Sequence, residues 1–487
     1  MWSKTVGGVA ALWLFAGMAV ASPWAEAGDA RLRSDIMVLA AAGVIDDITM
    51  QWPLPWGGIL DRLEEPGALG EQPDYVRDAA MRVRARGMAE TETHKPRASL
   101  TLDAASGPST VRGFDAMGRQ TVQGRVLLEY LWDTTAVHLA AGAQTTNRID
   151  HQAMVPDGSY IAQRLGNATV YAGYKTHWWG PGWVSAMSLS NNARPVLQIG
   201  IARAEMAPFE SPWLSWIGPW QAEFFIGLLD GPRAAKNTVY TGARFAFSPL
   251  PHLEIGFSRT TEMCGSGHEC KPLAGYFGLL NDDKHVNLTN DEATIDLRYS
   301  GAFAGWAYEI YTQAMNEDTS PFVHSGTSHL FGSSVWVPIE DGVGRLTFEY
   351  ADSLATKNIW GGGIMHGTAY NNYDYVDGMR YRGRTLGFSL DSDSQLVSVQ
   401  ANFTDQSSRS FTLAYHHTNI SDPLNAWGNV VTAAPVTINL AEGRFSQPLR
   451  LFERSILFDI AARLQDDQPR PDKGFQASVE VALTVSL

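Results

Sequence analysis

Long apolar runs are missing from the chain of 487 residues: beyond residue 21, no stretch of ~18 apolar residues occurs. A transmembrane helix is therefore not expected, because such a helix needs about 20 apolar residues to cross a bilayer. A lipid-anchored protein is disfavoured as well, since Ser22 stands where a lipoprotein has its cysteine. A secreted soluble protein and an outer-membrane β-barrel remain.

Cysteine is also scarce, because Cys264 and Cys270 are the only two. In an exported protein, two cysteines this close are predicted to form a disulfide that closes a small loop. The alternative is a metal site made of these cysteines and His268, for which a fourth ligand is not evident. We therefore predict no metal and no other cofactor.

Positive charge is in short supply, with 37 Lys and Arg against 51 Asp and Glu and a net charge of −14. This balance argues against nucleic acid as a partner. Only 18% of the residues are charged, while 11% are aromatic and 46 are glycine. That composition favours a barrel with aromatic girdles over a soluble secreted protein.

Compact catalytic motifs are missing too: the chain has no G-x-S-x-G, H-E-x-x-H or G-x-x-x-x-G-K-[ST]. We predict that the protein is not an enzyme and has no catalytic residues. An outer-membrane hydrolase stays open as an alternative, because Ser and His, or a carboxylate pair, could be assembled from distant strands or loops.

The N-terminus has the pattern of a secretory signal. Lys4 precedes an almost wholly apolar run, residues 6–18, and Ala19-Val20-Ala21 is a small-x-small cleavage site. We expect residues 1–21 to be a signal peptide that is removed, so that the mature chain begins near Ser22.

Residues 22–95 are predicted to form a small periplasmic helical bundle. Asp29 is the predicted N-cap of a first helix, whose apolar residues recur at helical spacing until Gly43. A short helix is expected at residues 59–63, and a third helix has Pro73 in its first turn.

From residue 96 to 487 the apolar period is two and turn residues separate the strands. In residues 479–487 every odd residue is aliphatic and every even one small or polar, so that one face can meet lipid and the other a lumen. With about 20–24 residues for a strand and its share of turn, roughly 16–20 strands fit. We predict an all-β, transmembrane antiparallel β-barrel with extracellular loops at residues 147–163, 263–290 and 316–329. The alternative fold is a secreted β-sandwich. The last residue is Leu487, whereas the last strand of an outer-membrane barrel commonly ends in an aromatic residue.

The stretch of residues 171–203 is the most informative one. It reads YAGYKTHWWGPGWVSAMSLSNNARPVLQIGIAR, with three tryptophans around Gly180-Pro181-Gly182 and paired asparagines after them. It closely resembles the outer-membrane capsule-assembly family known as Wzi. Further similar segments follow in the family's order, at residues 32–59, 259–261, 290–293, 348–352, 377–384 and 389–394. Residues 316–318 depart from the family pattern.

This resemblance implies a barrel of about 18 strands in the bacterial outer membrane. It also implies a lectin-like function, in which the protein binds capsular or exopolysaccharide and helps to attach and organise it at the cell surface. The expected partners are this polysaccharide and outer-membrane lipid, and we expect a monomer. The first alternative function is that of a porin or channel, and an outer-membrane hydrolase is a weaker alternative.

Three alternating arginines, Arg380, Arg382 and Arg384, are the first candidate binding residues. In a strand they would share one face, which cannot be the lipid face because an arginine there costs ~2–4 kcal/mol at mid-bilayer. They could bind the carboxylates of an acidic polysaccharide. Alternatively they pair with lumenal carboxylates such as Asp391 and Asp393.

Aromatic and amide side chains supply the other candidates. Trp178, Trp179, Asn192 and Arg194 could stack on and hydrogen-bond to sugar rings. Alternatively, the tryptophans belong to a membrane-interface belt or pack a plug inside the barrel, and Asn192 and Arg194 form a tight, hydrogen-bonded turn. On a polar stretch expected to be an exposed loop, aromatic and polar groups occur together as they do in carbohydrate sites. These last candidates are Asn371, Tyr373, Asp374 and Tyr375.

Overall fold

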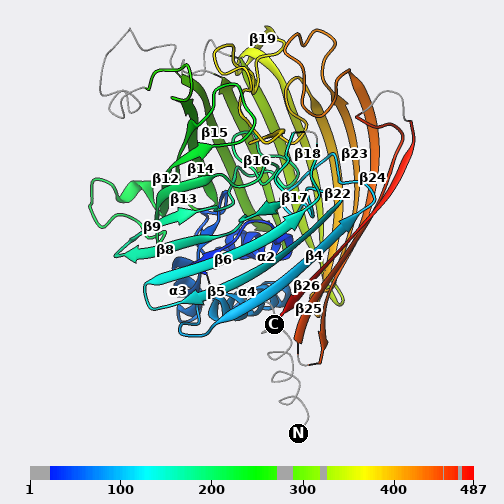
Figure 1. The fold of residues 1–487 in the computed structure, drawn as a ribbon. Helices are drawn as coiled ribbons and strands as arrows, with labels where there is room; N and C mark the ends of the chain where they lie inside the picture. Colours follow the sequence, from blue (N-terminus) through cyan, green and yellow to red (C-terminus); the bar gives the residue numbers. More distant parts are fainter. Residues whose placement is uncertain (1–21, 148, 271–288, 318–325, 453, 470–473) are drawn as a thin grey trace, which may run out of the picture.

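The computed structural model describes residues 22–147, 149–270, 289–317, 326–452, 454–469 and 474–487. Within them the chain forms a closed antiparallel β-barrel with the N-terminal helices at one end (Figure 1). The predicted signal peptide, residues 1–21, lies outside the described residues. No helix in the described ranges is long and apolar enough to cross a membrane.

The wall of the barrel has 18 strands within the described residues, which confirms the predicted fold class and strand number. In chain order the wall strands are β4 (Arg97–Ala105), β5 (Val122–Leu131), β6 (Thr135–Gln144), β8 (Tyr160–Leu165), β9 (Ala168–Gly173), β11 (Leu197–Arg203), β12 (Trp220–Leu229), β13 (Thr238–Leu250), β14 (Leu253–Met263), β15 (Thr289–Phe303), β16 (Trp306–Glu317), β17 (Thr327–Ile339), β18 (Gly342–Asn358), β22 (Gln395–Asp405), β23 (Ser410–Ile420), β24 (Val436–Leu451), β25 (Arg454–Gln465) and β26 (Gln476–Ser486). Two short strands, β7 (Met154–Val155) and β19 (Gly361–Ile364), lie beside neighbours that already pair directly.

Outward-facing residues of the wall are apolar and alternate with inward-facing polar ones. In β11, Leu197, Ile199 and Ile201 are 45%, 70% and 45% exposed, whereas Gln198 between them is 2% exposed. The outer face of such a barrel meets lipid, and its inner face meets the lumen. The two-residue period of the sequence therefore sets which side chains contact the membrane.

The last strand closes the barrel against the first, as predicted. β26 pairs with β4 from Glu480 opposite Ala105 to Ser486 opposite Ser99. Closure matters because the bilayer offers no water to the backbone, so a free strand edge there would leave N–H and C=O groups unpaired.

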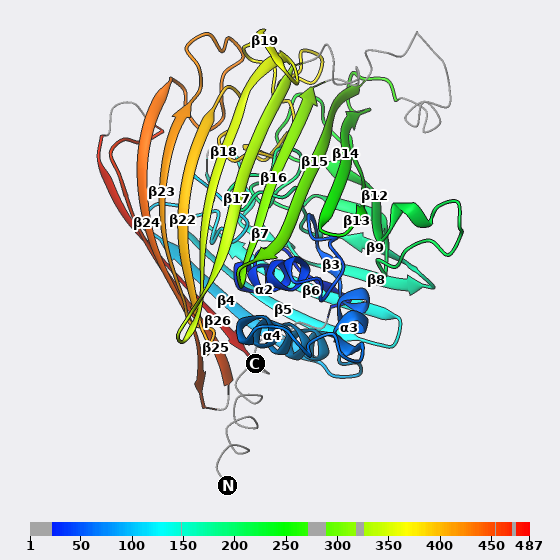
Figure 2. The same cartoon turned by 180° about the vertical axis from the view of Figure 1, so that it is seen from behind.

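The helices of the N-terminal segment are α2 (Ala30–Ala41), α3 (Trp56–Glu64) and α4 (Asp74–Glu90). Asp29 caps α2 as predicted, since its carboxylate accepts hydrogen bonds of 3.1 Å from the backbone N–H groups of Arg31 and Leu32. Helix α2 packs against α4 and touches β15 and β16. Figure 2 shows the helices across the end of the barrel where the C-terminus lies. The assignment of residues 22–95 to a separate periplasmic domain stays a prediction.

Residues 174–196 leave the wall between β9 and β11 and fold into the lumen. There β10 (Trp178–Trp179) pairs with β2 (Gln51–Trp52) of the N-terminal segment. Arg33 of α2 lies 4.5 Å from the ring centre of Phe114 and 4.4 Å from that of Trp183. Its guanidinium also donates to the carbonyl oxygens of Pro181 and Gly182, at 2.6 and 2.9 Å. Packed side chains therefore fill this part of the lumen.

Connections at the two ends of the barrel differ in length. At the helical end they are short, as at residues 132–134, 166–167 and 251–252, except for residues 204–219. At the other end they are long, as at residues 359–394 and 421–435. Short turns face the periplasm and long loops face the outside in barrels of this kind.

The predicted extracellular loops are only partly described. Of the loop expected at residues 147–163, the last part is wrong, because Tyr160 begins wall strand β8 with its own side chain inward and Ile161 outward. Polar neighbours hid this alternation. Residues 271–288 and 318–325 of the other two loops lie outside the described residues.

Candidate functional site

An open cleft of about 310 Å³ lies at the long-loop end of the barrel. Four segments that are far apart in the chain line it: Ile149, residues 230 and 232–233, residues 376–377 and 380–383, and residues 427–430. Loops mounted on a rigid barrel are the usual position for binding residues. The cleft is therefore the candidate site.

A two-residue hairpin carries the candidate arginines. Strands β20 (Arg380–Tyr381) and β21 (Arg384–Thr385) pair with each other, and Arg382 and Gly383 form the turn with φ of 50° and 80°. Positive φ at both central residues is typical of a type I′ turn. The prediction that the three arginines lie on one face of a single strand is therefore wrong, because the chain reverses between them.

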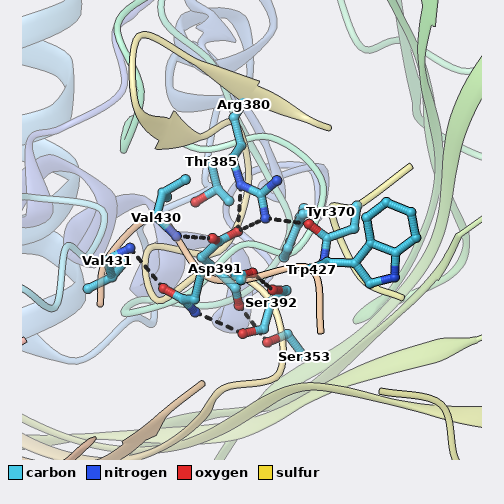
Figure 3. Close-up of polar contacts among 12 residues, drawn as sticks. Ser353, Tyr370, Arg380, Thr385, Asp391, Ser392, Trp427, Val430 and Val431 are labelled. Carbon is cyan, nitrogen blue, oxygen red and sulfur yellow. Dashed lines mark hydrogen bonds and ion pairs between the residues drawn. The ribbon is translucent and has the colours of Figure 1, made fainter. Parts of the chain in front are cut away.

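Arg380 is held by a buried carboxylate. Its Nε and Nη2 donate to Oδ1 of Asp391 at 3.0 and 2.8 Å (Figure 3). Nη2 also donates to Oδ1 of Asn371 at 2.8 Å. Arg380 is 9% exposed and Asp391 0%. Arg380 thus follows the alternative reading, in which an arginine pairs with Asp391, and it positions the hairpin in the cleft wall.

The second oxygen of the Asp391 carboxylate holds the loop of residues 421–435. Its Oδ2 accepts a hydrogen bond of 2.6 Å from the backbone N–H of Val430 (Figure 3). Beside it, the Asn429 side-chain amide donates to the carbonyl oxygens of Leu390 and Ser392, both at 2.9 Å. One buried carboxylate therefore joins the hairpin to the loop that carries Trp427.

Arg382 and Tyr381 form the charged part of the cleft. Arg382 donates to Asp230 at 3.0 Å and to Asp150 at 3.3 Å, and the Tyr381 hydroxyl donates to Asp230. The Asp230 side chain is 52% exposed, so that this group of residues meets solvent. Arg233, also on the cleft, is paired with Glu262 at 2.7 Å. The positive charges of the cleft are thus largely balanced by carboxylates.

Arg384 differs from the other two arginines, because its hydrogen bonds go to neutral oxygens. Nη2 donates to the carbonyl of Arg119 at 2.8 Å and Nη1 to Oδ1 of Asn192 at 3.5 Å. Burial and, to a smaller extent, the nearby charge of Arg119 together lower the pKa of the Arg384 guanidinium to about 10. The guanidinium stays protonated at neutral pH, which leaves a positive charge beside the cleft.

The segment of residues 371–375 divides between support and surface. Asn371 is buried against Arg380, and the Tyr375 hydroxyl donates to the Cys264 carbonyl at 3.1 Å. Tyr373, which is 73% exposed, and Asp374 face solvent. Cys264 and Cys270 form the disulfide, with an S–S distance of 2.22 Å.

The remaining candidates lie beneath the surface. Trp178 and Trp179 are 0% exposed within residues 174–196, the segment that folds into the lumen. Asn192 donates to the carbonyl of Thr385 at 3.0 Å, and Arg194 forms an ion pair with Asp157 at 2.8 Å. Asn192 thus contacts the hairpin directly, and Arg194 contacts it through Asp150, which also accepts a hydrogen bond from Arg382.

Trp427 and Asp230 are among the cleft residues that the sequence analysis missed. Trp427 is 55% exposed, and its backbone N–H donates to Asn425 at 3.1 Å in a tight polar turn. Asp230 follows β12 directly. The signal for Trp427 was available, since a lone tryptophan between asparagines and glycine in a polar loop has no core to join. Asp230 had no comparable signal.

The arrangement can hydrogen-bond and stack, and it offers little for metal chemistry. In the part of the chain that the structure describes, no group of three His, Cys, Asp or Glu side chains could hold a metal ion. Fold and site together define an outer-membrane β-barrel with a packed lumen and an extracellular cleft of mixed aromatic and charged character.

Comparison with known proteins places the chain in a family. The family model for the capsule assembly protein Wzi matches residues 91–451, more than half of the chain, and the protein belongs to this family. An uncharacterised 55.8 kDa protein from the cps region of Klebsiella pneumoniae is 28% identical over 320 residues, 62% of this chain. The match spans 60% of that relative's length.

A solved structure shows the same fold. It is Wzi of Escherichia coli, described as an outer-membrane protein involved in group 1 capsule assembly and a carbohydrate-binding β-barrel. The TM-score is 0.81 at 21% identity, over 96% of this chain and 99% of that one. The family and this fold identify the chain as an outer-membrane protein.

Proposed function

We propose that this protein binds capsular or exopolysaccharide at the extracellular cleft and so helps to attach the polymer to the cell surface. The half-exposed indole of Trp427 beside the fixed polar groups of Arg382 and Asp230 carries the proposal. An aromatic face can stack on a sugar ring, while guanidinium and carboxylate groups bond to its hydroxyls. The carbohydrate binding described for the Escherichia coli barrel supports the same function.

The candidate residues divide into two roles in this proposal. Tyr373, Asp374 and Trp427 contact the polymer, because they are exposed at the long-loop end. Arg382, whose side chain is 10% exposed, contacts it from the wall of the cleft. Arg384 supplies positive charge for an acidic sugar. The buried candidates position these residues; they are Arg380, Asn371, Tyr375, Trp178, Trp179, Asn192 and Arg194.

Retention of a polymer requires no covalent step, and we propose that the protein is not an enzyme. Each sugar repeat that binds raises the effective concentration of the next one, so that weak contacts add up along the chain. Incubation of the purified protein with its polysaccharide should release no shorter product. We also propose a monomer surrounded by outer-membrane lipid.

A porin is the second candidate, because the fold alone would allow it. The packing of Arg33, Phe114 and Trp183 inside the barrel favours binding over transport. In planar bilayers we expect only small currents from the purified protein. Stable, large conductance steps would instead support a porin.

A binding assay with the host's own surface polysaccharide tests the proposed function. We expect Trp427→Ala to reduce affinity by roughly 2- to 10-fold, since an aromatic contact contributes ~0.5–1.5 kcal/mol beyond its buried area. Trp360→Ala is the matched control, because Trp360 is 91% exposed on the neighbouring hairpin and does not line the cleft. Equal loss in both variants would argue against the cleft as the binding site.

A further inference from the structure

One connection at the helical end is much longer than its neighbours. Residues 204–219 join β11 to β12 where other turns of this end have two to four residues, such as residues 166–167 and 406–409. Both views show this connection extending sideways from the barrel, away from the lumen (Figures 1 and 2). In a barrel that spans a bilayer, a loop that extends sideways at this end can reach the lipid beside the wall.

Residues 206–220 read MAPFESPWLSWIGPW and hold a single charged side chain, that of Glu210. Trp213 is 87% exposed and Trp216 64%, and Leu214 between them also faces outward. Exposed tryptophans in a nearly uncharged loop are costly in water, whereas at a membrane interface the ring meets apolar chains and its N–H meets headgroups.

The loop is built as a fixed extension of the wall. The short helix η1 (Ser215–Ile217) ends at Gly218, whose φ of 68° and contact with the Ser248 carbonyl leave no room for a side chain. The Ser248 N–H in turn donates to the Pro219 carbonyl at 2.9 Å. These contacts hold the loop against β13.

A chain of ring contacts links the loop to the lipid-facing surface of the barrel. Phe209 stacks on Trp220 at 4.5 Å, and Trp220 contacts Phe245 at 5.8 Å. The row continues from Phe245 to Phe247 at 5.5 Å, on the outward face of β13. The loop that carries the exposed tryptophans thus continues, through Phe209 and Trp220, into aromatic side chains on the lipid-facing side of the barrel.

We propose that residues 206–220 are a membrane anchor, which inserts Trp213 and Trp216 into the interfacial layer of the periplasmic leaflet beside the barrel. The occupant of this surface is phospholipid. The anchor is separate from polysaccharide binding, since the loop and the cleft lie at opposite ends of the barrel.

A fluorescent label at Ser215→Cys tests the anchor. Ser215 is exposed, and the two native cysteines are joined in a disulfide, so that the introduced thiol is available for an environment-sensitive dye. Asp341→Cys, in an exposed short turn at the same end, is the matched control. Both variants are refolded into phosphatidylethanolamine–phosphatidylglycerol vesicles and checked for heat-modifiable gel mobility.

Brominated phospholipids should quench the label at residue 215 several-fold more than the label at residue 341, and aqueous iodide should do the reverse. Equal quenching at the two positions would overturn the proposal. So would concentration-dependent energy transfer between copies labelled at residue 215, because a second copy would then cover the loop.

A second variant keeps the test independent of labelling. Trp213→Phe combined with Trp216→Phe preserves the apolar rings and removes two of the 16 tryptophans of the full chain, of which Trp2 and Trp13 lie in the predicted signal peptide. The share of native fluorescence that brominated lipid quenches should fall in this variant. An unchanged share would overturn the anchor.

Discussion

Removing the carboxylate of Asp391 should loosen the cleft without opening the barrel. In Asp391→Ala, Arg380 loses both of its bonds to this carboxylate, and the N–H of Val430 loses its acceptor. The wall ladder does not use these groups, because they belong to the hairpin and to the loop of residues 421–435. The damage should therefore be confined to the extracellular end.

The size of the effect follows from burial. Asp391 is 0% and Arg380 9% exposed, so solvent does little to screen the charge that remains. Breaking such a pair by removing one partner costs about 3–5 kcal/mol. If that cost falls on local opening, the open fraction of the loops rises roughly a hundred- to several-thousand-fold.

Hydrogen exchange measured by mass spectrometry reads this opening directly. Exchange should accelerate in peptides from residues 377–390 and 421–435 and stay unchanged in the wall strands. Asp74→Ala is the control, since the Arg77–Asp74 pair is exposed and worth about 0–1 kcal/mol. Unchanged exchange at residues 421–435 in Asp391→Ala would refute the view that this carboxylate holds the cleft loops together.

Three further predictions concern other parts of the molecule. Arg382→Lys should weaken polysaccharide retention severalfold and leave the heat-modifiable gel mobility unchanged. The reason is that the point charge of lysine cannot bridge Asp150 and Asp230 as the guanidinium does. Retention equal to that of the wild type would count against this bridge. Burial, opposed by Arg86, raises the pKa of Glu90 to about 7, so its contribution to stability is complete below the ordinary pKa of 4.5 and is lost as the pH rises through 7. Glu90→Gln should flatten the change of the urea midpoint over this window, and an unaltered pH profile would contradict the assignment. Replacing Cys264 and Cys270 with alanine removes a small loop closure worth about 2 kcal/mol; proteolysis near residue 264 should speed up, while the heat-modifiable mobility of the barrel persists.

The architecture was predictable wherever a local rule applies. The alternation in β26 and the cap of α2 by Asp29 follow from side-chain direction and from unpaired N–H groups, which depend on a few neighbouring residues. Strand β8 was not predicted, because it is short and follows a polar stretch that is typical of a loop. Its pairing with β6 in the wall shows that it is a strand. The segment of residues 171–203 identified the family through its motif, although its tryptophans proved to be buried.

The cleft was not predictable in the same way. The alternating arginines were read as one strand face, but positive φ at Arg382 and Gly383 reverses the chain there. Glycine after arginine permits that turn without requiring it. Trp427 could have been noticed as an exposed aromatic, whereas its position beside the hairpin could not.

By itself, the sequence determined an exported barrel of about 18 strands and its membership of a capsule-assembly family, because periodicity and motif are properties of neighbouring residues. Only the tertiary structure decided the candidate site. Arg382 and Asp230 are 152 residues apart in the chain, and they meet because closure of the wall brings their loops to the same side of one opening. Such pairings decide which charges remain free for a ligand. The pairings in turn depend on strand register and loop packing across the whole barrel.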